Sequence, residues 1–93
     1  MVGEQLQAIL KSAQAKTEKD GFAVLPEGTT ATLYASHGGV GLTILRVEAT
    51  KLEGPMLTAR TTKRETYTLE VADVFAVAVE GNGPGPTRRA GFG

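Results

Sequence analysis

A change in residue pattern at position 22 constrains the fold of this chain more than any other feature. Residues 3–20 (GEQLQAILKSAQAKTEKD) are rich in Ala, Gln, Lys and Glu, and their apolar residues recur at helical spacing. From Phe22 to Glu80 the residues Thr, Val, Leu and Gly dominate, and apolar and polar positions alternate. Such alternation is typical of β-strands with one buried face. With 93 residues, the chain is expected to make one small domain.

The first pattern predicts an N-terminal amphipathic helix within residues 1–21. Its apolar face consists of Leu6, Ile9, Leu10 and Ala13, and the apolar stripe fades after Ala13. Asp20-Gly21 predicts the end of the helix, because glycine accepts the left-handed conformation that closes many helices. A single helix with so narrow a stripe is not stable alone. It must cover the rest of the domain or pair with a second copy of itself.

Residues 22–80 predict a mainly β domain of short antiparallel strands. Turn signals at Pro26–Gly28, Glu53–Pro55 and Thr62–Glu65 separate the alternating runs. We expect a small SH3-like or Sm-like antiparallel barrel of four to five strands, because closure removes the exposed edges that an open sheet leaves. The predicted segments are a short apolar piece at 22–25 and strands at 30–36, 40–50, 56–61, 66–71 and 74–80.

Val40–Thr50 is long for one strand, and its apolar residues change phase. Val40, Leu42 and Ile44 occupy alternate positions, but the series then continues with Leu45 and Val47. Because side chains alternate strictly between the two faces of a strand, this shift indicates a bent or bulged strand. In the later strands we expect Tyr67, Leu69 and Val71 to point inward, and Phe75, Val77 and Val79 to share a face.

The order of a helix, a bent-strand barrel and the segment Leu69–Val79 (LEVADVFAVAV) resembles the plan of Sm-like proteins. This resemblance implies a ring-forming barrel that binds RNA. In that family a glycine in the second strand precedes an acid and a base-binding loop that contains asparagine. Gly41 and Glu48 stand at the first two places, but the loop is 49–52 (ATKL), without asparagine. Val71-Ala72-Asp73 replaces the family's second motif, an Arg-Gly or Lys-His pair. The resemblance therefore concerns shape, and the base-binding residues do not carry over.

The segment Tyr34–Leu45 (YASHGGVGLTIL) contains His37, the only histidine of the chain, beside three glycines. A phosphate-binding loop leads into a helix, whereas these glycines lead into strand-like residues. We therefore predict a hairpin turn in which Gly38-Gly39 supply positive φ angles. A histidine can act as a general base, but no nucleophile or orienting acid accompanies His37 in the sequence. We interpret His37 as a turn residue without a catalytic role.

The sequence offers no evident set of residues for catalysis, a metal or a cofactor. With no cysteine and one histidine, a thiolate or multi-histidine metal site is nearly excluded. The acidic residues are scattered. Glu70 and Asp73 flank the break before the last strand, where an aspartate usually caps a turn with its own carboxylate. We expect a non-enzymatic protein with no catalytic, metal-binding or cofactor-binding residues.

Two groups of residues are candidates for binding. Ten basic and ten acidic side chains give a formal charge of zero, whereas nucleic-acid binders usually have a basic excess. A basic turn beside an aromatic ring is nevertheless able to grip phosphates and stack on a base. Residues 81–93 (GNGPGPTRRAGFG) have too little apolar content to order themselves, and we predict a disordered tail. The candidates are Arg60, Lys63, Arg64 and Tyr67 in the barrel, and Arg88, Arg89 and Phe92 in the tail.

These observations favour an interaction or regulatory module that self-associates, with itself or another protein as partner. A domain this small has a marginal core, and self-association is a route to stability that does not need disulfides or metals. The candidate self-association residues are Leu6, Ile9 and Leu10. The alternative is a single-stranded nucleic-acid binding protein of Sm-like or cold-shock-like type. The start MVGEQLQ lacks a signal sequence and no apolar run reaches membrane-spanning length, so we expect a cytoplasmic protein with no membrane partner.

Overall fold

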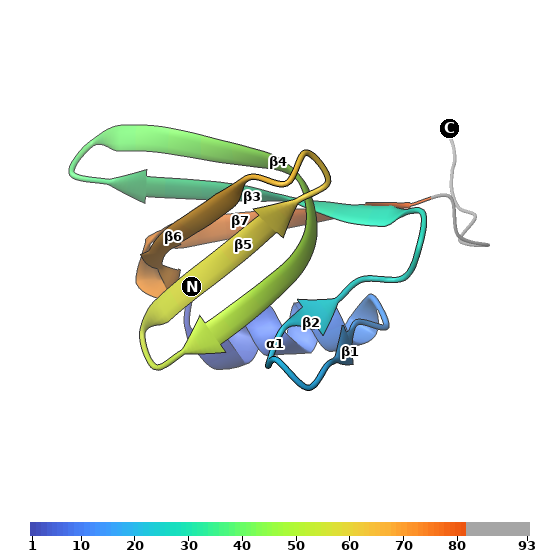
Figure 1. Ribbon diagram of the computed structural model, residues 1–93. Coiled ribbons are helices and arrows are strands. Elements are labelled where there is room, and N and C mark those ends of the chain that lie inside the picture. Colours follow the sequence, from blue (N-terminus) through green and yellow to red (C-terminus); the bar gives the residue numbers. More distant parts are fainter. Residues whose placement is uncertain (82–93) are drawn as a thin grey trace.

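The computed structural model describes residues 1–81 as one helix on a strongly curled antiparallel sheet, a half-barrel (Figure 1). The predicted mainly β architecture and the N-terminal helix are confirmed. Arg88, Arg89 and Phe92, with the predicted tail, lie outside the described residues. No helix in residues 1–81 has the length and apolar character needed to cross a membrane. The elements in chain order are α1 (Gly3–Ser12), β1 (Lys16–Thr17), β2 (Ala23–Val24), β3 (Thr29–His37), β4 (Val40–Glu53), β5 (Met56–Thr61), β6 (Thr66–Glu70), the one-turn 3-10 helix η1 (Val71–Asp73) and β7 (Val74–Gly81).

The long strand β4 organises the sheet, because it serves two layers. Its first half pairs with β3, and its second half pairs with β5 along one edge and with β2 along the other. β7 extends the ladder beyond β3, and β6 extends it beyond β5. The main ladder therefore has the order β6-β5-β4-β3-β7. Figure 1 shows β4 curving from the projecting hairpin down toward α1, so that the two layers enclose a core.

A bulge explains the change of phase in β4. Leu33 of β3 pairs with Ile44, whereas Ala31, two residues away, pairs with Val47, so β4 contains one extra residue between these pairs. Arg46 lies at this place with a φ of +58°, and the predicted bulged strand is confirmed. Ile44 and Val47 are both buried, but Leu45 is 62% exposed. The bulge therefore returns Val47 to the inner face and leaves Leu45 at the surface.

The core lies between the two layers and beneath α1. Leu6 and Leu10 of α1 are buried against the strands, so the helix covers the half-barrel of its own chain. Removing these apolar side chains from water is the main favourable contribution to the packing of α1. The buried core residues are Leu6, Leu10, Leu25, Ala31, Leu33, Ala35, Ile44, Val47, Leu57, Ala59, Val71 and Val74.

The helix ends earlier than the sequence indicates. A stop at Asp20-Gly21 is wrong, because α1 ends at Ser12 and Gln14 adopts the left-handed conformation with a φ of +66°. The N–H of Ala15 donates to the carbonyl of Leu10, and the N–H of Gln14 donates to Lys11. This is the Schellman pattern of a helix C-terminus. Residues 16–17 then pair with β2 in a small hairpin. Helix propensity, which depends on single residues, does not indicate this pairing.

The predicted side-chain directions agree with the structure in β6 but not at the start of β7. Tyr67 and Leu69 are half-buried and Val71 is buried, as expected. In β7, however, Ala35 pairs with Val74 and Tyr34 pairs with Ala76, so Phe75 is an extra, bulged residue. The expectation that Phe75 shares a face with Val77 and Val79 is therefore wrong, because the bulge interrupts the alternation. Val74 is buried there and Phe75 is exposed.

Candidate functional site

The β3–β4 hairpin projects beyond the rest of the sheet and leaves part of its inner face open (Figure 1). Gly38 and Gly39 form its turn with φ angles of +58° and +83°, which confirms the predicted hairpin turn. Leu42 pairs with Ala35, and Val40 pairs with His37. Because residues paired across a ladder point to the same face, Val40 and Leu42 lie on the side that faces β6 and η1.

A groove of about 430 Å³ lies between this hairpin and β6. We call it the hairpin groove. Val40 is 70% exposed and Leu42 is 42% exposed, while Leu69 of β6 forms the opposite wall. Single exposed apolar residues are normal on a protein surface, but a group of them around one groove indicates a contact surface. The lining residues are Ala35, Ser36, His37, Val40, Gly41, Leu42, Leu69 and Asp73.

A smaller hollow of about 160 Å³ lies farther along β6, toward the β5–β6 turn. Leu45 and Tyr67 contribute its apolar surface, and Lys63 and Glu65 lie at its border. The Tyr67 hydroxyl donates a hydrogen bond to the Glu65 carboxylate at 3.4 Å. The open side of the half-barrel therefore presents apolar side chains along most of β6.

Two strand edges of the main ladder are unpaired within residues 1–81. β6 pairs with β5 alone, and β7 pairs with β3 alone. An unpaired edge presents a row of backbone N–H and C=O groups that accept another strand. β7 also carries the exposed Phe75 and Val79, and the Phe75 ring lies 6.3 Å from that of Tyr34. One edge adjoins the hairpin groove and the other carries exposed apolar side chains.

Three polar residues meet at one end of the hairpin groove. His37 Nδ1 lies 3.0 Å from Asp73 Oδ2, and a carboxylate oxygen of Glu70 completes a set of atoms within 4.8 Å of one another. The Asp73 carboxylate thus has a partner 36 residues away, in contrast to the expected cap of its own turn. This acidic partner of His37 was not predicted from the sequence. No local residue pattern indicates that the end of β3 lies beside η1.

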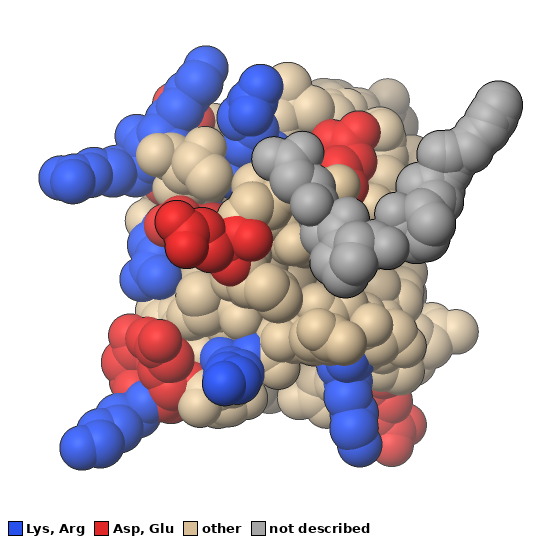
Figure 2. All heavy atoms as spheres, turned by 90° about the vertical axis from the view of Figure 1, so that its right-hand side faces the viewer, with Lys and Arg blue, Asp and Glu red and all other residues tan. Residues whose placement is uncertain are grey.

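The barrel candidates for nucleic-acid binding do not form one surface. Arg60 Nε lies 3.3 Å from Glu48 Oε2, and its guanidinium lies 4.9 Å from the centroid of the Phe22 ring. Ala59 is buried and pairs with Tyr67, so Tyr67 points to the inner face and Arg60 to the outer one. Lys63 and Arg64 are exposed in the β5–β6 turn. On the face shown in Figure 2, Lys and Arg side chains are spread out, with Asp and Glu side chains among them.

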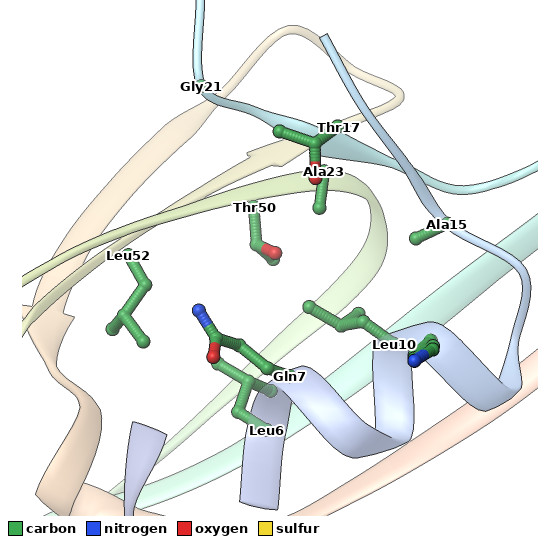
Figure 3. Close-up of a pocket in the computed structure, with 10 residues that line it drawn as sticks. Leu6, Gln7, Leu10, Ala15, Thr17, Gly21, Ala23, Thr50 and Leu52 are labelled. Carbon is green, nitrogen blue, oxygen red and sulfur yellow. The ribbon is translucent and has the colours of Figure 1, made fainter. Parts of the chain in front are cut away.

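A further cavity, of about 300 Å³, separates α1 from β1, β2 and β4 (Figure 3). Leu6 and Leu10 reach into it from the helix, and Thr50 and Leu52 from β4. Two of the candidate self-association residues therefore face strands of their own chain. Ile9 is half-buried on the other flank of α1, beside Phe75.

Comparison of the chain with models of known protein families, with curated proteins and with solved structures found no match. The functional interpretation therefore depends on the hairpin groove, the strand edges and the charges around them.

Proposed function

We propose that this protein is a non-enzymatic interaction module that self-associates through the hairpin groove and the unpaired strand edges. The observation that carries the proposal is the exposure of Val40 and Leu42 on the inner face of a projecting hairpin, opposite Leu69. Burial of apolar surface contributes about 25 cal/mol per Å² removed from water, so an occupant of this groove gains affinity from these side chains. His37 lies at the surface beside the carboxylates of Asp73 and Glu70, so it adds a polar group at the end of the groove.

A second copy of the chain is the partner that fits these surfaces. The edge of β6 borders the groove, and the edge of β7 carries the exposed Val79. Addition of an extended strand to a free edge combines backbone hydrogen bonds with side-chain contacts on the sheet face. Pairing of β6 in one copy with β7 in the next joins two different surfaces, so the contact is head-to-tail and produces a closed ring or an open filament.

The proposal also includes a specific fold, a small SH3-like or Sm-like barrel. A five-strand ladder in the order β6-β5-β4-β3-β7, with the one-turn helix η1 between β6 and β7, supports an SH3-like or Sm-like barrel. The bent strand β4, which contributes to both layers, supports the same assignment. Fold resemblance alone carries no activity, so the proposed function stands on the groove and the edges.

Size-exclusion chromatography with light scattering, over a range of protein concentrations, tests the proposal. We expect the native chain to exceed the monomer mass at high micromolar concentration, and Val40→Lys to lower the association constant about tenfold or more, because a charge replaces an apolar contact. Val40 is 70% exposed, so this change leaves the fold intact. Thr17→Lys, at an exposed site in β1 far from the hairpin (Figure 1), is the charge-matched control. A strict monomer at every concentration would refute self-association.

Single-stranded nucleic-acid binding is the second candidate function. The observation that favours it is the smaller hollow, where Lys63 adjoins Tyr67 and Leu45, since phosphate contacts beside a stacking ring are the usual elements of such a site. A titration with single-stranded RNA at several salt concentrations tests this candidate, because phosphate contacts produce a steep salt dependence. Absence of binding at low salt rejects it, whatever the oligomeric state of the protein.

A further inference from the structure

Three elements that are distant in the sequence bring a nitrogen and two carboxylates to one point. His37 ends β3, Glu70 ends β6, and Asp73 lies in the one-turn helix η1 that follows β6. Two of the three positions are held by strand ladders, since His37 pairs with Val40 and Glu70 pairs with Met56. Side chains carried by regular elements are placed more precisely than side chains on free loops. This cluster is therefore a reproducible feature of the fold.

We propose that His37, Glu70 and Asp73 form a binding site for a divalent transition-metal ion, with Zn²⁺ as its typical occupant. Zinc accepts imidazole nitrogen and carboxylate oxygen at about 2.0–2.2 Å and prefers tetrahedral geometry, which separates neighbouring ligand atoms by about 3.3 Å. His37 Nδ1 and Asp73 Oδ2 lie 3.0 Å apart. The Glu70 oxygen lies within 4.8 Å of both atoms, and the exposed glutamate side chain closes this distance by rotation about its own bonds.

The charge of the cluster also matches a divalent cation. Two carboxylates at such short range repel each other, and a dication between them replaces this repulsion with attraction to both. The imidazole of His37 supplies the nitrogen ligand that favours zinc over magnesium or calcium, which prefer oxygen ligands alone. Three protein ligands leave a fourth position for water or for a group from another molecule. Because His37 and Asp73 line the hairpin groove, an ion held here contacts whatever enters that groove.

Isothermal titration of Zn²⁺ into the full chain tests the site, together with NMR of the imidazole. The chain contains one histidine, so its ring resonances report on this position without ambiguity. We expect one ion per chain and a shift of the ring resonances that saturates at the same stoichiometry. His37→Ala and Glu70→Gln should each weaken binding by about tenfold or more, since the loss of even an indirect ligand partner typically costs 10–100-fold.

Glu27→Gln is the matched control, because Glu27 is an exposed acid in the β2–β3 connection and not a member of the cluster. It should bind zinc as the native chain does. The His37 side chain is 76% exposed, so His37→Ala removes a ligand without disturbing the core, and circular dichroism checks that both variants remain folded. Absence of saturable binding overturns the proposal. Binding that persists at native strength in His37→Ala, or that leaves the imidazole resonances unmoved, overturns it as well by placing the ion elsewhere.

Discussion

Replacement of Leu6 by alanine tests whether α1 belongs to the core of its own chain. Leu6 is 1% exposed and lies between α1 and β4 (Figure 3). If the helix covers its own barrel, the substitution destabilises the monomer itself. If the helix instead served a contact between copies, the substitution would change the association constant and leave the stability of the monomer almost unaltered.

The expected loss of stability follows from the surroundings of Leu6. Leucine has three more carbons than alanine, and each buried methylene contributes about 0.8 kcal/mol, so the transfer term is about 2.4 kcal/mol. A closed cavity adds to this cost, but Leu6 lines a cavity of about 300 Å³ that is already present. The vacated space joins this cavity, so the additional cost is small. We therefore expect a decrease in the free energy of unfolding of about 2.5–3.5 kcal/mol, within the usual range for such substitutions.

Urea unfolding of dilute protein, followed by far-UV circular dichroism, measures this quantity. The method suits the chain because it has no tryptophan to serve as a fluorescent probe. In thermal unfolding the same loss lowers the Tm by roughly 10–25 °C for a domain of this size. Leu33→Ala is the upper reference, because Leu33 is fully enclosed in the core and should lose about 3–5 kcal/mol. Val2→Ala is the lower reference, because Val2 is 59% exposed and should change stability by less than about 0.5 kcal/mol.

The reasoning fails if Leu6→Ala costs no more than Val2→Ala. It also fails if the cost appears only at protein concentrations where the chain self-associates. Either result would place the apolar face of α1 against a second copy, the alternative that the helical pattern alone leaves open.

Other substitutions test the backbone and the surface in the same unfolding assay. Gln14→Gly should raise the free energy of unfolding by about 0.5–1 kcal/mol, because Gln14 holds a φ of +66° that glycine adopts without strain; a loss would contradict the assigned helix end. Thr61→Val should cost about 1–2 kcal/mol, because Thr61 Oγ1 accepts hydrogen bonds from the N–H groups of Lys63 and Glu65, both at 3.2 Å. Thr61→Ser keeps both bonds and loses one buried methyl group, so it should cost about 0.8 kcal/mol. A smaller loss for Thr61→Val than for Thr61→Ser would mean that packing, not these bonds, matters. Gly39→Ala should cost about 1–2 kcal/mol, because Gly39 has a φ of +83° that alanine adopts only with strain. Gly41→Ala should be nearly neutral, because Gly41 has open space around it and no positive φ. A larger loss for Gly41→Ala than for Gly39→Ala would rule out the assigned turn.

The local pattern was sufficient for the strands and turns but not for the end of the helix. Alternation located all the long strands, and Gly38-Gly39 located the hairpin, because period and φ preference are properties of neighbouring residues. The helix was predicted too long because residues 3–20 as a whole are rich in helix-forming residues, whereas residues 16–17 pair with β2 in the fold. That pairing depends on the sheet that β2 joins. Helix propensity is a weak guide where tertiary contacts of this kind compete with it.

The candidate site also has features that the local pattern predicts and features that depend on strand pairing. Sequence alone determined a mainly β domain with one helix, a bulged central strand and an inner face for Tyr67, since each follows from the alternation of neighbouring side chains. Tertiary structure alone decided which exposed residues share a surface. It placed Arg60 on the opposite face from Tyr67, and it brought His37 to within 3.0 Å of Asp73. The physical reason is that the ladder register and the bulges orient each side chain, and both depend on pairing between strands that are separate in the sequence.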